Sequence, residues 1–142
     1  MTAATGATAS GACLCRAVGF VAALPSRWVA HCHCTRCRRA HGAAFVTWVG
    51  LDGERVELRD PDGRLAWHRA EGGGERGFCA TCGSTLFFRS PQWPGELHVV
   101  LANFDQPVDR APQAHAYWDT HVDWVHVADE LPKKPAPDAA SP

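Results

Sequence analysis

The stretch Phe78-Cys79-Ala80-Thr81-Cys82-Gly83 carries two cysteines in a tight turn that a glycine closes. Such a turn brings two thiolates about 3.5 to 4 Å apart, as a tetrahedral zinc with bonds to sulfur of about 2.3 Å requires. Far upstream, Gly11-Ala12-Cys13-Leu14-Cys15 presents two more sulfurs. We expect all four cysteines to hold one zinc, which would tie an N-terminal strand to a distant hairpin and contribute to the folding free energy.

A third cluster, Cys32-His33-Cys34-Thr35-Arg36-Cys37, lies between these two and carries three cysteines. Three thiolates on one zinc leave the fourth corner open, and an open position distinguishes catalytic zinc from structural zinc. One alternative is closure of this corner by a histidine, for which the candidates are His31, His33 and His41. Adjacent side chains of an extended segment alternate faces, so His33 should point away from the sulfurs. A redox-sensing cysteine trio is the other alternative.

Short segments rich in Val, Phe, Trp and Leu alternate with turns rich in Gly, Pro and Asp, which is typical of an antiparallel, mainly β domain. One short helix is expected over residues 35–41, with Gly42 closing it in a left-handed conformation. The expected strands are Ala17–Leu24, Phe45–Leu51, Arg55–Arg59, Leu65–Arg69, Thr85–Arg89 and Leu97–Ala102.

Length and composition indicate one domain and do not favour a nucleic-acid or anionic-lipid partner. The chain has 142 residues, 14 Lys plus Arg and 15 Asp plus Glu, so no basic surplus favours nucleic acid or anionic lipid. Neither a secretory signal nor a membrane-spanning apolar run is evident, and we expect a cytoplasmic protein. Because disulfides are rare in that reducing compartment, the seven cysteines favour metal binding. The expected organisation is a flexible lead over residues 1–10, a zinc domain over 11–131 and a Pro-rich flexible tail over 132–142.

Several other residues have both a functional and an ordinary interpretation. Arginines near the clusters could offset thiolate charge or bind a carboxylate, or could simply be exposed: Arg36, Arg38, Arg39 and Arg76. The six tryptophans are assigned to packing, although Trp48 could line a pocket. Loop histidines exposed to solvent are expected at His115, His121 and His126, despite the nearby Asp119 and Asp123. The run Gly72–Gly74 is either a mobile loop over the site or a hairpin tip.

Together, the three ordered cysteine motifs resemble those of the glutathione-dependent formaldehyde-activating enzyme family. The likeness extends through Leu101–Pro107, Pro112, His115, Trp124 and Leu131-Pro132, and so covers nearly all of residues 11–132. It implies a β-tent of small antiparallel sheets leaning over a structural zinc. It also implies two zinc ions: a structural one held by Cys13, Cys15, Cys79 and Cys82, and a catalytic one held by Cys32, Cys34 and Cys37.

The activity that the resemblance implies is a carbon–sulfur lyase reaction, the formation of S-hydroxymethylglutathione from formaldehyde and glutathione, as in aldehyde detoxification. The partners would then be a small thiol and an aldehyde, with no nucleic acid and no membrane, and with the oligomeric state open, a homodimer included. The competing hypothesis is a non-catalytic zinc domain for protein interaction in which both zinc sites are closed. The fourth ligand of the second zinc distinguishes the two.

Overall fold

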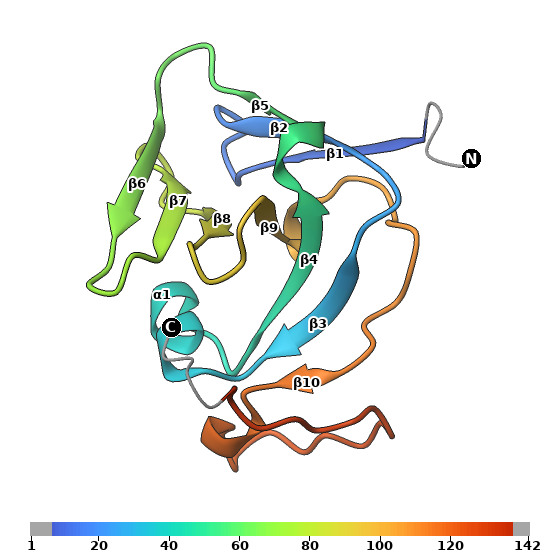
Figure 1. Ribbon diagram of the computed structural model, residues 1–142. Coiled ribbons are helices and arrows are strands. Elements are labelled where there is room, and N and C mark those ends of the chain that lie inside the picture. Colours follow the sequence, from blue (N-terminus) through green and yellow to red (C-terminus); the bar gives the residue numbers. More distant parts are fainter. Residues whose placement is uncertain (1–6, 138–142) are drawn as a thin grey trace.

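The computed structural model describes residues 7–137, which form ten strands, one α-helix and three short 3-10 turns (Figure 1). The strands are β1 (Thr8–Ala12), β2 (Gly19–Ala23), β3 (Trp28–Cys32), β4 (Val46–Asp52), β5 (Val56–Arg59), β6 (Leu65–Arg69), β7 (Glu75–Cys79), β8 (Thr85–Arg89), β9 (Glu96–Val100) and β10 (His115–Ala116). The α-helix is α1 (Thr35–His41), and the 3-10 turns are η1 (Gly53–Arg55), η2 (Leu101–Asn103) and η3 (Trp118–Thr120). No described helix is long and apolar enough to cross a membrane.

The strands form two sheets that lean on one another, so the expected mainly β fold with one short helix is confirmed. The smaller sheet has the order β1-β2-β5, and the larger has the order β10-β3-β4-β9-β8-β7-β6. Neighbouring strands are antiparallel, except that β10 runs parallel to β3. Figure 1 shows β1, β2 and β5 above the ends of β4 and β9, with the β6–β7 hairpin leaning in from the side.

Two apolar clusters fill the interior. The larger lies between the sheets, where residues of β2, β4, β8 and β9 turn their side chains inward. Its large members include Phe20, Leu51 and Phe87, all fully buried. The second cluster surrounds Cys32, Cys34 and Cys37 and adds aromatic side chains from other elements. The three-cysteine segment is therefore part of a core.

Capping residues explain where helix α1 begins and ends. Cys34 caps the N-terminus of α1 with an extended backbone, and Gly42 ends the helix at φ +60°, the left-handed conformation expected there. Helix α1 has the predicted bounds, as do strands β6 and β8. Strands β1, β3, β7 and β10 were not among the predicted segments.

Both chain ends differ from the expected flexible segments. Strand β1 begins at Thr8, inside the expected lead, because its backbone pairs with β2. Residues 132–137 lie along β10: His115 N–H donates to the Pro132 carbonyl at 2.8 Å, and Lys134 N–H donates to the His115 carbonyl at 2.8 Å. The edge of β10 that does not face β3 therefore pairs with residues 132–134. The prolines of that segment had predicted a flexible tail instead. The remaining parts of the expected lead and tail, 1–6 and 138–142, lie outside the described residues.

Candidate metal centres and pocket

The four cysteines of the first and last motifs meet, although more than sixty residues separate the two pairs. Their sulfurs all lie within 4.8 Å of one another. Cys13 Sγ is 3.7 Å from Cys15 Sγ, which is 3.8 Å from Cys79 Sγ. These spacings suit four thiolates around one tetrahedral ion. The fold thus brings the β1–β2 turn next to the end of β7 and the β7–β8 turn.

Hydrogen bonds to the sulfurs support this four-cysteine cluster. Ser84 Oγ lies 3.2 Å from Cys82 Sγ, and this contact lowers the pKa of Cys82 to about 5. The same hydroxyl accepts a hydrogen bond from Leu14 N–H at 2.9 Å, which links the two cysteine turns directly. Val18 N–H donates to Cys13 Sγ at 3.4 Å. Groups that bond to the sulfurs favour the thiolate and orient it for a metal.

The second cluster comprises Cys32, Cys34 and Cys37, and all three side chains are buried. Cys32 ends β3, Cys34 caps α1, and Cys37 lies in the first turn of that helix, where its N–H donates to Cys34 Sγ at 3.2 Å. Contacts with the sulfurs of Cys32 and Cys37 hold the pKa of Cys34 well below its usual range. Their sulfurs also lie within 4.8 Å of one another.

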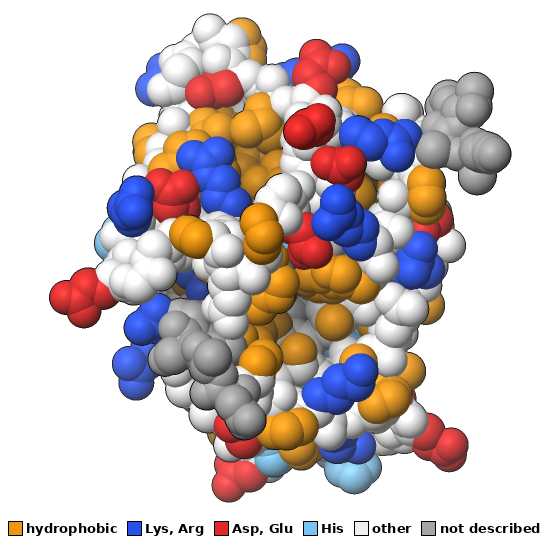
Figure 2. Space-filling view, viewed as in Figure 1, with side chains coloured by type: hydrophobic (Ala, Val, Ile, Leu, Met, Phe, Trp, Pro, Cys, Tyr) orange, Lys and Arg blue, Asp and Glu red, His pale blue; other side chains and the backbone are white. Residues whose placement is uncertain are grey.

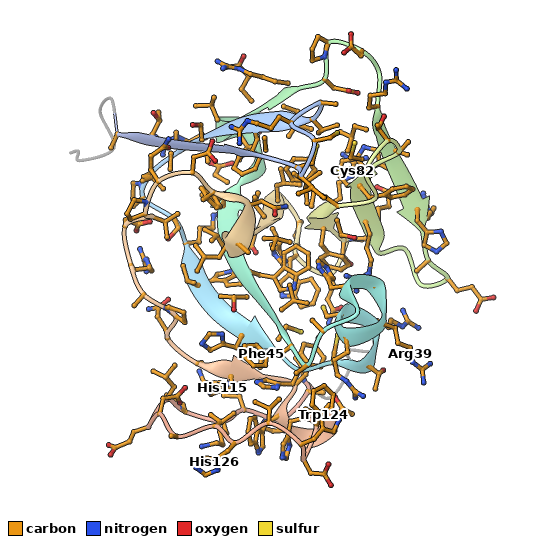
Figure 3. All side chains as sticks on the ribbon, turned by 180° about the vertical axis from the view of Figure 1, so that it is seen from behind. Arg39, Phe45, Cys82, His115, Trp124 and His126 are labelled. Carbon is orange, nitrogen blue, oxygen red and sulfur yellow. The ribbon has the colours of Figure 1, made fainter. Side chains whose placement is uncertain are left out.

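One arginine faces this second cluster. Both terminal nitrogens of Arg76, on β7, lie 3.8 Å from Cys37 Sγ, and the guanidinium lies 4.9 Å from the centre of the Phe88 ring. A guanidinium at this place offsets the negative charge of clustered thiolates. Two arginines of helix α1 are oriented away from the three sulfurs. Arg38 donates to the Thr120 carbonyl, and Arg39 points away from the molecule (Figure 3).

Within residues 7–137, no histidine nitrogen or carboxylate joins the three sulfurs of the second cluster. His33 points to the other side of β3, as the alternation of side chains predicts, and His41 meets the Trp48 ring edge-on at 5.4 Å. The Tyr117 hydroxyl is buried without a hydrogen-bond partner. Burial, and then the nearby thiols, raise the pKa of Tyr117 to about 12. Three soft sulfurs beside an unpartnered hydroxyl fit a metal with an open position.

Behind the three-cysteine segment lies a chain of hydrogen bonds that the sequence did not reveal. His33 Nε2 is 2.8 Å from His115 Nδ1, and His115 Nε2 is 3.0 Å from Asp129 Oδ1. The expectation of a solvent-exposed His115 is therefore wrong: the residue is 1% exposed because β10 packs it against β3. His121 and His126 are exposed as expected. Burial and the neighbouring His115 lower the pKa of His33 to about 4.

The second cluster opens onto a pocket of about 460 Å³. Trp48 lines it, as predicted, and Trp28 and Trp93 line it as well, although they had been assigned to packing. Figure 2 shows hydrophobic side chains gathered on this face with Lys and Arg around them. Gly72–Gly74 instead forms the tip of the β6–β7 hairpin, where Ala70 N–H donates to the Gly74 carbonyl. The lining residues are Trp28, Val29, Ala30, Cys32, Cys34, Cys37, Trp48, Arg76, Phe88, Trp93, His98, Gln113, Ala114, Ala116, Tyr117, Lys134, Pro135 and Pro137.

Comparison with known proteins agrees with this geometry. An uncharacterized lyase of Schizosaccharomyces pombe is 31% identical over 78 residues, a match that spans 55% of each chain, so this protein corresponds to about half of that relative. A crystal structure of a Rhodobacter sphaeroides protein has the same fold, with a TM-score of 0.59 and 22% identity over 69% of this chain and 89% of that one. The sequence profile of the family described as glutathione-dependent formaldehyde-activating enzyme matches residues 8–120, which contain all seven cysteines. The chain therefore belongs to the glutathione-dependent formaldehyde-activating enzyme family.

Proposed function

We propose that this protein is a zinc-dependent carbon–sulfur lyase that forms or breaks the bond between an aldehyde carbon and a thiol sulfur. The family's name points to formaldehyde and glutathione, with S-hydroxymethylglutathione as their adduct. The lyase name of the yeast relative agrees with the reaction class. The observation that carries the proposal is the second cluster, whose three sulfurs lie at a pocket and have no fourth protein ligand among residues 7–137.

The two cysteine clusters would have different roles. Cys13, Cys15, Cys79 and Cys82 would hold a structural zinc, since four thiolates complete its coordination. Zinc held by Cys32, Cys34 and Cys37 would supply a Lewis-acid position that a substrate atom can reach. Clustered thiolates remain free to bind metal in a reducing compartment, which suits a cytoplasmic location.

The chain's own groups suit the addition of a thiol to an aldehyde. In that addition the sulfur bonds to the carbonyl carbon, and the thiol proton ends on the carbonyl oxygen; the reverse step restores both reactants. The unpartnered Tyr117 hydroxyl can donate a hydrogen bond to that oxygen as negative charge develops on it. Arg76 offsets the charge of the thiolates, and the largely apolar lining lowers the polarity around the reacting groups.

The alternative, a protein-interaction module with both sites closed, needs a histidine on the second cluster. His33 faces His115, and neither His31 nor His41 joins the sulfurs. The proposed partners are therefore a small thiol and an aldehyde.

The test is the rate at which glutathione and formaldehyde interconvert with their adduct, measured by magnetisation-exchange NMR with the zinc-loaded protein. We expect the native protein to accelerate the exchange. Cys37→Ser should lose the acceleration, because its cluster lies beside the pocket. It should keep the fold, because Cys32, Cys34 and Cys37 are close in sequence and do not join distant parts of the chain. Cys82→Ser should instead lower the folded yield, because its cluster joins two distant parts of the chain. Equal unfolding of both variants would contradict the division of roles.

A further inference from the structure

The pocket has a continuous aromatic wall that the addition of glutathione to formaldehyde does not require. Starting from the cysteines, Trp48 and Phe88 have ring centres 6.1 Å apart, and Phe88 and Trp93 are again 6.1 Å apart. His98 continues the wall at 5.5 Å from Trp93, and Trp28 follows at 4.6 Å from His98. These rings come from β3, β4, β8, β9 and the β8–β9 turn, so the tertiary fold assembles the wall.

Two polar edges of this wall, those of Trp28 and His98, are already satisfied within the protein. Glu96 Oε1 accepts a hydrogen bond from Trp28 Nε1–H at 3.3 Å and lies 2.8 Å from His98 Nε2. The Glu96 carboxylate, which is not part of the pocket lining, thus binds the polar atoms of both rings. The carbon surfaces of the two rings therefore face the pocket. Gly50 makes room for this arrangement, because a Cβ at that position would collide with the Trp28 indole.

Size argues against formaldehyde as the occupant of the wall, and the apolar ring surfaces argue against the polar glutathione backbone. A volume of about 460 Å³ suits a small organic ligand, whereas formaldehyde has one carbon and one oxygen and would leave the wall uncovered. Among the described lining residues the charged side chains are Arg76 and Lys134, and no Asp or Glu is present. These two cations suit the carboxylates of glutathione as the thiol partner, and they leave the aromatic rings for the aldehyde.

We propose that the aldehyde handled by this protein carries an aromatic ring, which lies against Trp28, Phe88 and Trp93 while its carbonyl carbon reaches the three-cysteine cluster. This inference rests on the proposed function for the reaction and specifies its substrate class. The bond that forms is again the one between thiol sulfur and carbonyl carbon, with the thiol proton transferred to oxygen. Ring stacking and burial of the aromatic group supply the binding free energy.

A binding experiment tests the pocket independently of catalysis. 2-Phenylethanol, which resembles an aromatic aldehyde but cannot react, is titrated into the zinc-loaded protein while the indole N–H signals are followed by NMR. We expect saturable binding at least about tenfold tighter than that of 2-propanol, with shifts at Trp28 and Trp93. Trp93→Ala should weaken it about tenfold, and Trp124→Ala is the matched control because that indole is 69% exposed and lies outside the lining.

If Trp93→Ala fails to fold, binding of 2-phenylethanol at the aromatic wall is tested with Trp93→Leu and with the indole shifts of the native protein. The inference is wrong if 2-phenylethanol binds no better than 2-propanol, or if S-methylglutathione alone binds and shifts the same indole signals.

Exchange rates with formaldehyde and with phenylacetaldehyde, each with the same thiol, then separate the two proposals. We expect the larger acceleration for phenylacetaldehyde. Acceleration for formaldehyde alone would overturn the aromatic substrate and leave the lyase function standing. Binding of 2-phenylethanol without acceleration for either aldehyde would support an aromatic ligand and contradict the lyase function.

Discussion

At the scale of single residues, Arg76 is a charged side chain that connects the β7–β8 hairpin to the three-cysteine cluster. Its two terminal nitrogens lie 3.8 Å from Cys37 Sγ, and they reach the sulfur from a different strand. Three thiolates together carry a charge that burial makes costly, and a guanidinium held by Phe88 reduces that cost. The arginine therefore acts on the affinity of the cluster for metal.

We predict that Arg76→Met weakens zinc binding at the three-cysteine cluster by about ten- to a hundredfold, because it removes the cation that contacts Cys37. Competition with a chromophoric chelator measures the affinity of each site. Arg39→Met serves as the control, since that arginine points away from the molecule (Figure 3). Unchanged affinity in Arg76→Met would show that the thiolates need no compensating charge.

His41 illustrates how burial on the helix produces sensitivity to acid. Burial, followed by the positive charge of Arg76, lowers its pKa to about 4, and its Nε2 has no hydrogen-bond partner. The unfolded chain takes up the proton near pH 6.5, whereas the folded chain resists it until about pH 4. The stability associated with neutral His41 is thus fully present above pH 6.5 and is lost as the pH falls from 6.5 toward 4.

We predict that His41→Phe flattens this part of the pH profile, because phenylalanine keeps an aromatic ring at Trp48 but cannot bind a proton. Urea unfolding at pH 7.5 and pH 5 would show a smaller loss of stability for the variant. Loss of zinc in acid affects both proteins and cancels in the comparison. Identical pH profiles would mean that His41 titrates in the fold as it does in solution.

The sequence predicted the site residues unevenly. All seven cysteines could be grouped from their motifs, because metal ligands occur at short, characteristic spacings. Tyr117 and Asp129 had no such signal. They reach the site through long-range contacts, and Tyr117 does so with a left-handed backbone, φ +56°, that its sequence does not suggest. The local pattern thus reveals the candidate metal ligands but not the groups around them.

At the scale of elements, β1 and β7 were missed because they carry few large apolar residues. Strand β1, Thr-Ala-Ser-Gly-Ala, has small residues and no hydrophobic alternation, and its stability comes from pairing with β2. Strand β7 carries Glu75, Arg76 and Gly77 at positions where a core strand would have apolar side chains. Pairing partners distant in sequence determine both strands, and no local window contains them.

The close approach of β1 to the segment after β9 leads to a prediction at this scale. A Cβ on Gly11 would collide with the Asn103 carbonyl oxygen and the Phe20 ring. We expect Gly11→Ala to destabilise the fold by about 2 kcal/mol and to disturb the nearby four-cysteine cluster. Urea denaturation measures the change, and Thr8→Ala on the exposed end of the same strand is the control. A stability equal to that of the native protein would show that the two segments can separate without cost.

At the scale of the whole molecule, the pocket is completed by a segment that contains no cysteine. Lys134, Pro135 and Pro137 line the pocket, and Ala136 N–H donates to Asp119 Oδ1 at 3.0 Å. The same segment satisfies the buried N–H of His115 through the Pro132 carbonyl. The two cysteine clusters, in contrast, lie between residues 13 and 82. Metal binding and pocket formation are therefore separable in the chain.

We predict that a chain ending at Leu131 keeps both cysteine clusters but loses the pocket wall that Lys134, Pro135 and Pro137 form. Removing residues 132–142 leaves His115 N–H and Trp118 N–H without their carbonyl partners, which should cost about 2 kcal/mol or more of stability. Zinc content should match that of the native protein, whereas 2-phenylethanol binding and adduct exchange should fall together. A chain ending at Pro137 is the matched control, because it keeps every contact described for this segment. If the shorter chain binds and reacts as the control does, residues 132–137 only stabilise β10, and the substrate lies entirely against the aromatic wall.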